Sequence, residues 1–317
     1  MASLDLDASR MHINEAEAGS RLDRALLRHI GQEKRQLVMR LIRRGNVRVN
    51  GKRAKVDQRL HEGDSIFLPA SLRVGKGPDA KRPKEKRASL TNVQTLFEDD
   101  HILVLNKPAG VVVHSGSGYS AGLIEQLREL RKLPELRLVH RLDRDTSGCL
   151  LLAKTLPILR ILAEDFRSGR MHKTYLSWVT GHMIPTAGRM QSFLRKGVTM
   201  GGERMVVHDE SGQKAITDYQ VIQHVLCQNE EFSFLALMPL SGRTHQLRVQ
   251  LQYENHSIFG DHKYSSRPAR DLFRSMGGKG MALHAWRLRF VHPVTHQSLE
   301  LRAPVPAWWA SCFNIKN

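Results

Sequence analysis

The sequence predicts an α+β fold divided into two domains, and three observations support this class. The chain has 317 residues, about twice the roughly 150 residues of a typical domain. Residues 70–90 contain two prolines, two glycines, seven basic residues and no aromatic residue, a composition typical of a linker. Beyond residue 90, strand-like apolar segments mix irregularly with helical patterns, which favours α+β over a regular βαβ repeat. We therefore expect a tail over 1–14, a small domain over 15–69, a basic linker over 70–90 and a larger domain over 91–317.

The charge of the chain predicts a polyanionic partner. Lys and Arg outnumber Asp and Glu by 49 to 31, which gives a net charge of +18 and a pI near 10.3. Residues 1–90 hold 21 basic and 11 acidic residues, so this first part alone carries +10. Nucleic acid is the first candidate and an anionic membrane surface the second, while a charge that only aids solubility is the remaining alternative.

The cysteines and the apolar segments exclude several protein classes. Cys149, Cys227 and Cys312 lie far apart, with no CxxC pair and no His cluster at zinc spacing, so neither a disulfide scaffold nor a structural zinc site is expected. Isolated thiols are typical of a reducing compartment. The N-terminus lacks the apolar run of a signal peptide, and no segment is apolar enough to span a bilayer. We therefore predict a cytoplasmic protein without a membrane span or a metal.

Residues 15–69 are expected to contain two helices and a hairpin. Ser20 is a suitable cap for a helix from Arg21 to about Ile30, and a second helix from about Glu33 to Arg44 ends at Gly45. Asn50 and Gly51 then form the strongest two-residue hairpin signal.

The second helix presents two different faces. At 100° per residue, its apolar residues fall on one side and its arginines on the other. The basic side chains that we predict to contact an RNA or DNA backbone, on this face and in the adjacent hairpin, are Arg35, Arg40, Arg43, Arg44, Arg48 and Lys52. Arginine binds phosphate through two parallel hydrogen bonds; the alternative is a solvated helix surface.

The larger domain is expected to alternate short strands with helices. The expected strands are Ile102 to Leu105, Gly110 to Val113, Cys149 to Ala153, Tyr175 to Val179, Phe232 to Leu237 and Leu288 to Val291. The expected helices are Ala121 to Arg131, Pro157 to Phe166 and His245 to Tyr253. The run Ser265 to Lys279 is expected to be a surface loop, and a mobile loop that contacts RNA is a weaker alternative.

Polar residues are densest between His140 and Gly148, in the run HRLDRDTSG. The composition alone favours a turn, since Asp, Thr, Ser and Gly are turn formers. However, an apolar strand follows directly, so part of this run must lie at the edge of a core. A carboxylate flanked by arginines there, such as Asp143, would stay ionised and be available as a nucleophile or a base.

Two further segments are candidates for the same site. Arg243 and Arg248 bracket a turn that enters a helix, where an arginine can pair with a carboxylate or bind phosphate; the alternative is a surface cap. Tyr175 begins a strand in KTY, and it is either a core residue or a platform on which a base stacks.

Four motifs, in order, resemble those of the RluA-type pseudouridine synthases. They are LNKPAGVVVH, HRLDRDTSG, KTYLSWVTG and SGRTHQLRVQ, and closing segments LHAWRLRFVHP and LRAPVP follow. This resemblance covers residues 91–317, and the small domain resembles the S4 RNA-binding domain through RLDRALL, RRGNVRVNGK and GDSIFLP. It implies a catalytic domain with a mixed, mainly antiparallel sheet, preceded by an S4 domain.

The resemblance also implies roles for individual residues. Asp143 matches the catalytic aspartate, Arg248 the arginine that pairs with it, and Arg243 is a lesser candidate for that pairing. Tyr175 matches the tyrosine that stacks on the target uracil, and Leu247 would pack against the base. Arg141 matches the residue that enters the RNA stack when the nucleotide is flipped out.

The implied reaction is the isomerisation of specific uridines to pseudouridine in 23S rRNA, free or in a large-subunit assembly intermediate. It breaks the N1–C1′ bond and forms a C5–C1′ bond, so no cofactor, metal or donor is expected. Asp143 would attack C1′ or remove the C2′ proton, and the sequence leaves both open. A monomer is expected. The rivals are a non-catalytic S4 RNA-binding protein and a pseudouridine synthase for other uridines.

Overall fold

In a computed structural model, the chain folds into two compact units, Met1–Lys84 and Glu85–Asn317. The structure describes residues 9–31, 34–72, 90, 93–114, 121–200 and 203–313. Most of the predicted linker, residues 73–89, lies outside the described residues, as do residues 1–8 of the predicted tail. Both units combine helices with a sheet, so the predicted α+β class is confirmed.

The N-terminal unit packs two helices on a four-stranded sheet of order β1-β4-β2-β3. Its elements are β1 (Arg10–His12), η1 (Glu15–Glu17), α1 (Leu22–Ile30), α2 (Arg35–Arg43), β2 (Arg48–Val49), β3 (Lys52–Arg53), β4 (Ser65–Phe67) and η3 (Ala70–Leu72). Strand β1 pairs with β4, and Leu72 is buried in the core of this unit. The folded unit therefore extends into both the predicted tail over 1–14 and the predicted linker over 70–90.

The first helix does not start as predicted. Its cap position is Arg21, which makes no side-chain capping hydrogen bond, and Ser20 is not the cap. The backbone of Ser20 instead accepts a hydrogen bond from Leu60, and Arg21 forms a β-bridge with Arg59. Pairing with that neighbouring segment keeps the chain extended up to residue 21.

The end of α2 and the following hairpin agree with the prediction. Gly45 has a φ of +76°, and the amide of Asn46 donates to the carbonyl of Leu41, as in a Schellman motif. Asn50 and Gly51 both have positive φ angles, which join β2 to β3 by a tight turn. Val38 and Ile42 are fully buried, while the arginine face of α2 is exposed.

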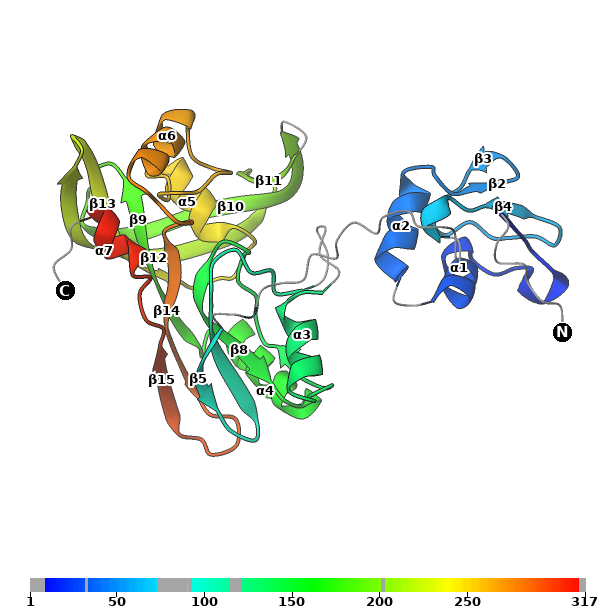
Figure 1. Cartoon of the computed structure of the whole chain (residues 1–317), viewed down its shortest axis with the longest axis horizontal. Coiled ribbons are helices and arrows are strands. Elements are labelled where there is room, and N and C mark those ends of the chain that lie inside the picture. Colours follow the sequence, from blue (N-terminus) through cyan, green and yellow to red (C-terminus); the bar gives the residue numbers. More distant parts are fainter. Residues whose placement is uncertain are drawn as a thin grey trace. The chain divides into compact units, whose positions relative to one another are not determined.

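The C-terminal unit is built on one 11-stranded sheet, with helices packed on it (Figure 1). Its strands are β5 (Gln94–Glu98), β6 (Ile102–Lys107), β7 (Arg137–Leu138), β8 (Ser147–Ala153), β9 (His172–Thr180), β10 (Ala187–Met200), β11 (Glu203–His208), β12 (Gln213–Cys227), β13 (Glu230–Pro239), β14 (Leu283–Val291) and β15 (Ser298–Arg302). Its helices are α3 (Leu123–Leu130), α4 (Leu156–Arg167), α5 (Gln246–Tyr253), α6 (Arg267–Ser275) and α7 (Trp308–Phe313).

The strand order is β11-β10-β12-β13-β9-β14-β8-β6-β5, with β15 beside β14 and β7 beside β8. Every pairing is antiparallel except that of β14 with β8. The mixed, mainly antiparallel sheet is therefore confirmed.

Alternation along the strands explains which helix covers which face. Leu103 and Leu105 of β6 pack in one cluster with α3, whereas Ile102 and Val104 pack in another with α4. Because both faces of β6 are covered, this strand reads as a continuous apolar run in the sequence.

Strand β9 alternates in the same way. Leu176 and Trp178 pack with α6 and α7, whereas Val179 packs with Leu247 and Leu251 of α5. Tyr175 contacts the cluster of α5 and also that of α3. This strand therefore directs Tyr175 to the face that carries α5.

Two segments differ from the prediction. Gly110 to Val113 is not a strand, because the backbone at Val112 and Val113 accepts hydrogen bonds from Leu123 and Ile124 at the start of α3. The run Ser265 to Lys279 is not a loop but contains α6, capped by the side chain of Ser266. The expected loop was therefore wrong.

The single parallel contact in the sheet demands a glycine. Gly148 of β8 has a φ of +110° and faces Ala285 of β14, whose carbonyl oxygen would lie 2.3 Å from a β-carbon at Gly148. Only glycine avoids both the strain and the clash. This contact fixes the strand that follows Asp143 against the centre of the sheet.

Candidate active site

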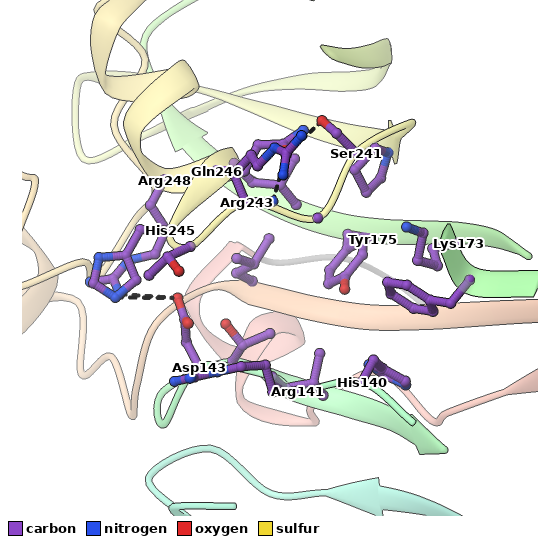
Figure 2. Close-up of a pocket in the computed structure, with 18 residues that line it drawn as sticks. His140, Arg141, Asp143, Lys173, Tyr175, Ser241, Arg243, His245, Gln246 and Arg248 are labelled. Carbon is purple, nitrogen blue, oxygen red and sulfur yellow. Dashed lines mark hydrogen bonds and ion pairs between the residues drawn. The ribbon is translucent and has the colours of Figure 1, made fainter. Parts of the chain in front are cut away.

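A pocket of about 220 Å³ lies between the segment that precedes β8, strand β9 and the start of α5. Figure 2 shows His245 and Arg248 beside Asp143, with Tyr175 in the same pocket on its own strand. The residues that line the pocket and were predicted as site residues are Arg141, Asp143, Tyr175, Arg243, Leu247 and Arg248. The structure thus brings together all six residues that the sequence predicted for the active site.

Asp143 is held by an arginine from the far side of the pocket. Arg248 Nη1 donates to Asp143 Oδ2 at 3.3 Å. The side chain of Asp143 keeps 19% of its surface exposed, against 7% for Arg248. No described residue bonds to Asp143 Oδ1. One carboxylate oxygen is therefore held by the protein while the other remains available to a substrate.

A second carboxylate fixes Arg248, and the sequence reading did not identify it. Arg248 Nε and Nη2 donate to the two oxygens of Asp261, at 2.7 and 2.8 Å, and Asp261 is fully buried as a side chain. Burial alone would lower the pKa of Arg248, but Asp261 and then Asp143 raise it above its usual value. Burial alone would raise the pKa of Asp261, but the hydrogen bonds and the charge of Arg248 hold it below its usual value. Both groups are therefore charged, and the pair is a bidentate ion pair.

His245 also faces Asp143. Its Nε2 lies 3.8 Å from Asp143 Oδ2, and its Nδ1 lies 2.7 Å from the hydroxyl of Tyr264. His245 has a positive φ of 53° at the start of α5. This backbone conformation aims the ring back into the pocket.

Aromatic and apolar groups form the opposite wall. Tyr175 lines the pocket beside Leu247, and burial, followed by the charge of Asp143, raises its pKa above the usual value. The phenol is therefore neutral at physiological pH. A flat apolar wall next to an ionised carboxylate suits a planar base attached to a sugar.

The far end of the pocket is closed by a stacked group. His140 stacks on Phe166 at 5.3 Å, and the ammonium of Lys173 lies 4.3 Å from the same ring. Burial, and next the charge of Lys173, lowers the pKa of His140 to about 4. His140 is therefore neutral, and its Nε2 accepts the amide of Leu151.

A buried lysine anchors the segment that carries Asp143. Lys107 Nζ donates to the carbonyls of Pro108, Val111 and Arg144 at 2.9 to 3.0 Å. Burial lowers its pKa to about 7, against the opposing charges of Asp145 and Asp143. The three carbonyls match the three donors of an ammonium, so Lys107 ties the backbone next to Asp143 to the end of β6.

The arginines adjacent to Asp143 in the sequence do not hold it. Arg144 pairs with Asp145 through two hydrogen bonds, and Arg141 is exposed at the pocket. Arg243 donates to the carbonyl of Lys214 and not to a carboxylate. Of the two arginines considered as partners, Arg248 is the one that contacts Asp143.

Asp261, His245 and Lys107 are the site residues that the sequence reading did not identify. An Asp after the apolar run SIFG was the available signal for Asp261, since a charge next to buried residues needs a partner. Nothing in the spacing connects it with Arg248.

The basic residues predicted in the N-terminal unit are all exposed. None of Arg35, Arg40, Arg43, Arg44, Arg48 and Lys52 forms an ion pair with a described residue. Arg48 lines a groove on the sheet of this unit, with Arg10 and Phe67. These six cations are therefore free to bind phosphate.

The part of the chain that the structure describes contains no cluster of three or more metal-ligating side chains. In the same part, no helix is long and apolar enough to cross a membrane.

Comparison with known families finds two matches. Residues 101–253 match the RNA pseudouridylate synthase model, and residues 20–66 match the S4 domain. The first match contains Asp143, Tyr175 and Arg248, and the second contains the arginine face of α2. The likeness predicted from the motifs is thereby confirmed.

Similar proteins match nearly the whole chain. The ribosomal large subunit pseudouridine synthase C of Salmonella typhi is 40% identical over 308 residues, which cover 94% of this chain and 93% of that protein. Its namesake from Escherichia coli strain K12 is 40% identical over 310 residues, with 95% and 94% covered. Among solved structures, human RNA pseudouridylate synthase domain containing 1 has a TM-score of 0.58 at 28% identity, and covers 69% of this chain and 85% of that one.

Proposed function

This chain belongs to the RNA pseudouridylate synthase family, and from that membership we propose that it converts specific uridines of 23S rRNA to pseudouridine. The observation that carries the proposal is the ion pair between Asp143 and Arg248 in a pocket walled by Tyr175. Relatives named for the large ribosomal subunit, at 40% identity over nearly the full chain, support 23S rRNA as the substrate.

Asp143 is the catalytic residue in this proposal. The reaction breaks the N1–C1′ bond of uridine, rotates the detached uracil and joins its C5 to C1′, with the C5 proton finally transferred to N1. Asp143 Oδ1 has no partner among the described residues, so it can attack C1′ or take the C2′ proton. Either step begins from an ionised carboxylate.

Arg248 acts as a positioning residue that holds Asp143 Oδ2. Its other two nitrogens, Nε and Nη2, donate to buried Asp261, and this second contact holds the planar head in place beside Asp143. Fixing the carboxylate in advance avoids an orientational cost during the reaction.

Tyr175 and Leu247 would hold the base during its rotation. Both line the pocket with Asp143, and a neutral phenol ring offers a stacking face to uracil in either orientation. Arg243, also at the pocket and exposed, is available to an RNA phosphate.

The uridine must leave its helix to reach this pocket, which costs a few kcal/mol. Arg141 is exposed beside Asp143, where its guanidinium can occupy the gap that the flipped nucleotide leaves. Stacking of that planar group on the neighbouring bases offsets part of the unstacking cost.

The N-terminal unit would bind the rRNA backbone through the six exposed cations around α2 and β2. The substrate is free rRNA or a large-subunit assembly intermediate, which also implies a cytoplasmic location. We expect a monomer, because RNA supplies the partner surface; a sedimentation measurement that gives a dimer would contradict this.

The test is incubation of unmodified 23S rRNA with the protein, followed by carbodiimide mapping of pseudouridine by primer extension. New stops at defined uridines are expected with the unchanged protein. Asp143→Asn should give no product while binding RNA as before, whereas Asp145→Asn, two residues away, should still form product. An unchanged protein that modifies no 23S uridine would refute the function, and an active Asp143→Asn variant would refute the role of Asp143.

A further inference from the structure

His245 is set in the pocket by contacts that the proposed roles of Asp143, Arg248 and Tyr175 do not use. Its ring is largely buried, with 18% of the side chain exposed. One ring nitrogen faces Tyr264 and the other faces Asp143. The position of the proton on the ring therefore decides whether Asp143 faces an N–H group or the lone pair of a nitrogen.

The hydrogen bonds of Tyr264 identify that nitrogen. The hydroxyl of Tyr264 accepts the amide of Val206 at 3.1 Å, so its own proton remains to be donated. His245 Nδ1, 2.7 Å away, is the acceptor that the described residues offer. Tyr264 keeps its proton, because burial raises its pKa.

The other tautomer would be unfavourable at both ends of the ring. A proton on Nδ1 would leave the hydroxyl proton of Tyr264 without an acceptor, which costs about 1–3 kcal/mol for a buried group. It would also turn the lone pair of Nε2 toward a carboxylate oxygen. Burial, and then the opposed charges of Asp143, Arg248, Lys263 and Asp261, leave the pKa of His245 below its usual value, so the ring is neutral at physiological pH.

We propose that His245 is a positioning residue for Asp143, locked by Tyr264 in the tautomer that carries its proton on Nε2. The Nε2–H group is directed at the oxygen that Arg248 also approaches, at 3.8 Å in the resting site. That distance is too long for a hydrogen bond, and contacts of this kind commonly tighten only in the substrate complex. This inference rests on the proposed function of the pocket.

A neutral N–H donor orients a carboxylate without binding it as strongly as a second cation would. Arg248 already supplies one full positive charge to Asp143, and another would hold the carboxylate too strongly for it to react. The dipole of a neutral N–H group orients Oδ2 and leaves Oδ1 directed to the substrate. Misplacing a reacting group by about 1 Å can cost on the order of 100-fold in rate.

The test compares single-turnover rates at saturating RNA, together with RNA affinity. His245→Asn suits the positive φ but cannot reach Asp143, so its rate should fall, by up to about 100-fold, with unchanged affinity. His245→Gln places an amide donor nearer to Asp143 and should recover part of the rate. The matched control is His296→Asn, an exposed histidine with a φ of 57°, which should react like the unchanged protein.

A further variant, Tyr264→Phe, tests whether Tyr264 fixes the tautomer of His245. In the unchanged protein, protonation of His245 would sacrifice the hydrogen bond from Tyr264. Without the hydroxyl, protonation of His245 no longer loses this hydrogen bond and becomes easier. The acidic limb of the rate–pH profile should therefore move to higher pH. Circular dichroism and RNA affinity report whether the variant remains folded.

Three results would overturn the proposal while the unchanged protein still forms pseudouridine. They are a full rate for His245→Asn, an equal loss for His245→Asn and His245→Gln, and an acidic limb that does not move in Tyr264→Phe. If the unchanged protein itself forms no pseudouridine, the proposed function fails first.

Discussion

Arg248 Nη1 lies 3.3 Å from Asp143 Oδ2, although 105 residues separate the two in the sequence. The contact depends on Asp261, which accepts hydrogen bonds from the other two nitrogens of the guanidinium, Nε and Nη2. Asp143 is therefore positioned by a chain of two charged groups, of which the second is completely buried.

Replacing Asp261 by Asn should destabilise the C-terminal unit by about 3–5 kcal/mol, because Arg248 would be left as a buried charge with one partially exposed partner. All four tryptophans lie in this unit, so urea unfolding followed by tryptophan fluorescence reports on it selectively. The matched control is Asp271→Asn, whose exposed pair with Arg274 should contribute at most about 1 kcal/mol. Equal stabilities of the two variants would contradict the role of Asp261.

Replacing Gly148 by Ala should destabilise the same unit by about 3 kcal/mol or more, from backbone strain and overpacking together. The new methyl group would lie 2.3 Å from the Ala285 carbonyl oxygen, and β8 would have to separate from β14. Gly169→Ala is the control, since Gly169 also has a positive φ, of 77°, but no atom within 4 Å of the added carbon. The difference between the two unfolding free energies isolates the close approach of the strands.

Stability should fall on acidification between about pH 6.5 and pH 4. Burial lowers the pKa values of His140 and His284 to about 4, so in this range the unfolded chain binds more protons than the folded one. The loss approaches about 1.4 kcal/mol per pH unit for each histidine. Urea unfolding at pH 7 and pH 5 measures it, and His284→Gln should show the weaker dependence. A chain that is more stable at pH 5 would disprove this assignment.

Neutralising Arg40 and Arg43 together should weaken RNA binding and reduce its salt dependence. Both side chains are exposed on α2, and each phosphate contact contributes about 0.7–0.9 to the slope of log K against log salt. The double variant to Gln should lower the slope by about 1.5. Arg274→Gln with Arg302→Gln removes the same charge from two arginines that pair with carboxylates. An equal loss in that control would mean that only net charge matters.

The motifs that resemble those of a known family predicted the parts of the site that they contain. Asp143, Tyr175, Arg248 and Leu247 each fall in one of three such motifs, and the pocket contains all four. Asp261 and Tyr264 were beyond prediction because their partners are set by the path of the chain after α5. The tautomer of His245 depends on Tyr264.

Some elements of the fold were not predicted from the sequence, for similar reasons. Strands β10 and β12 pair with each other over eight positions, but many of their side chains are exposed and polar, so the apolar signal is weak. Helix α6 has one buried residue, Phe273, and its charged surface resembles a loop in composition. Ser20 looked like a cap, but pairing with the segment near Leu60 decided where α1 begins.

The separation of Asp143 from Arg248 has a consequence for the protein during its own synthesis. At about 5–20 residues per second, the ribosome adds the 105 residues between them in roughly 5–20 s, and Asp261 follows later still. The N-terminal unit is translated before any of these three residues. A nascent chain therefore has its RNA-binding surface before it has a complete active site. A polypeptide that terminates early, ahead of Arg248, would occupy RNA without modifying it.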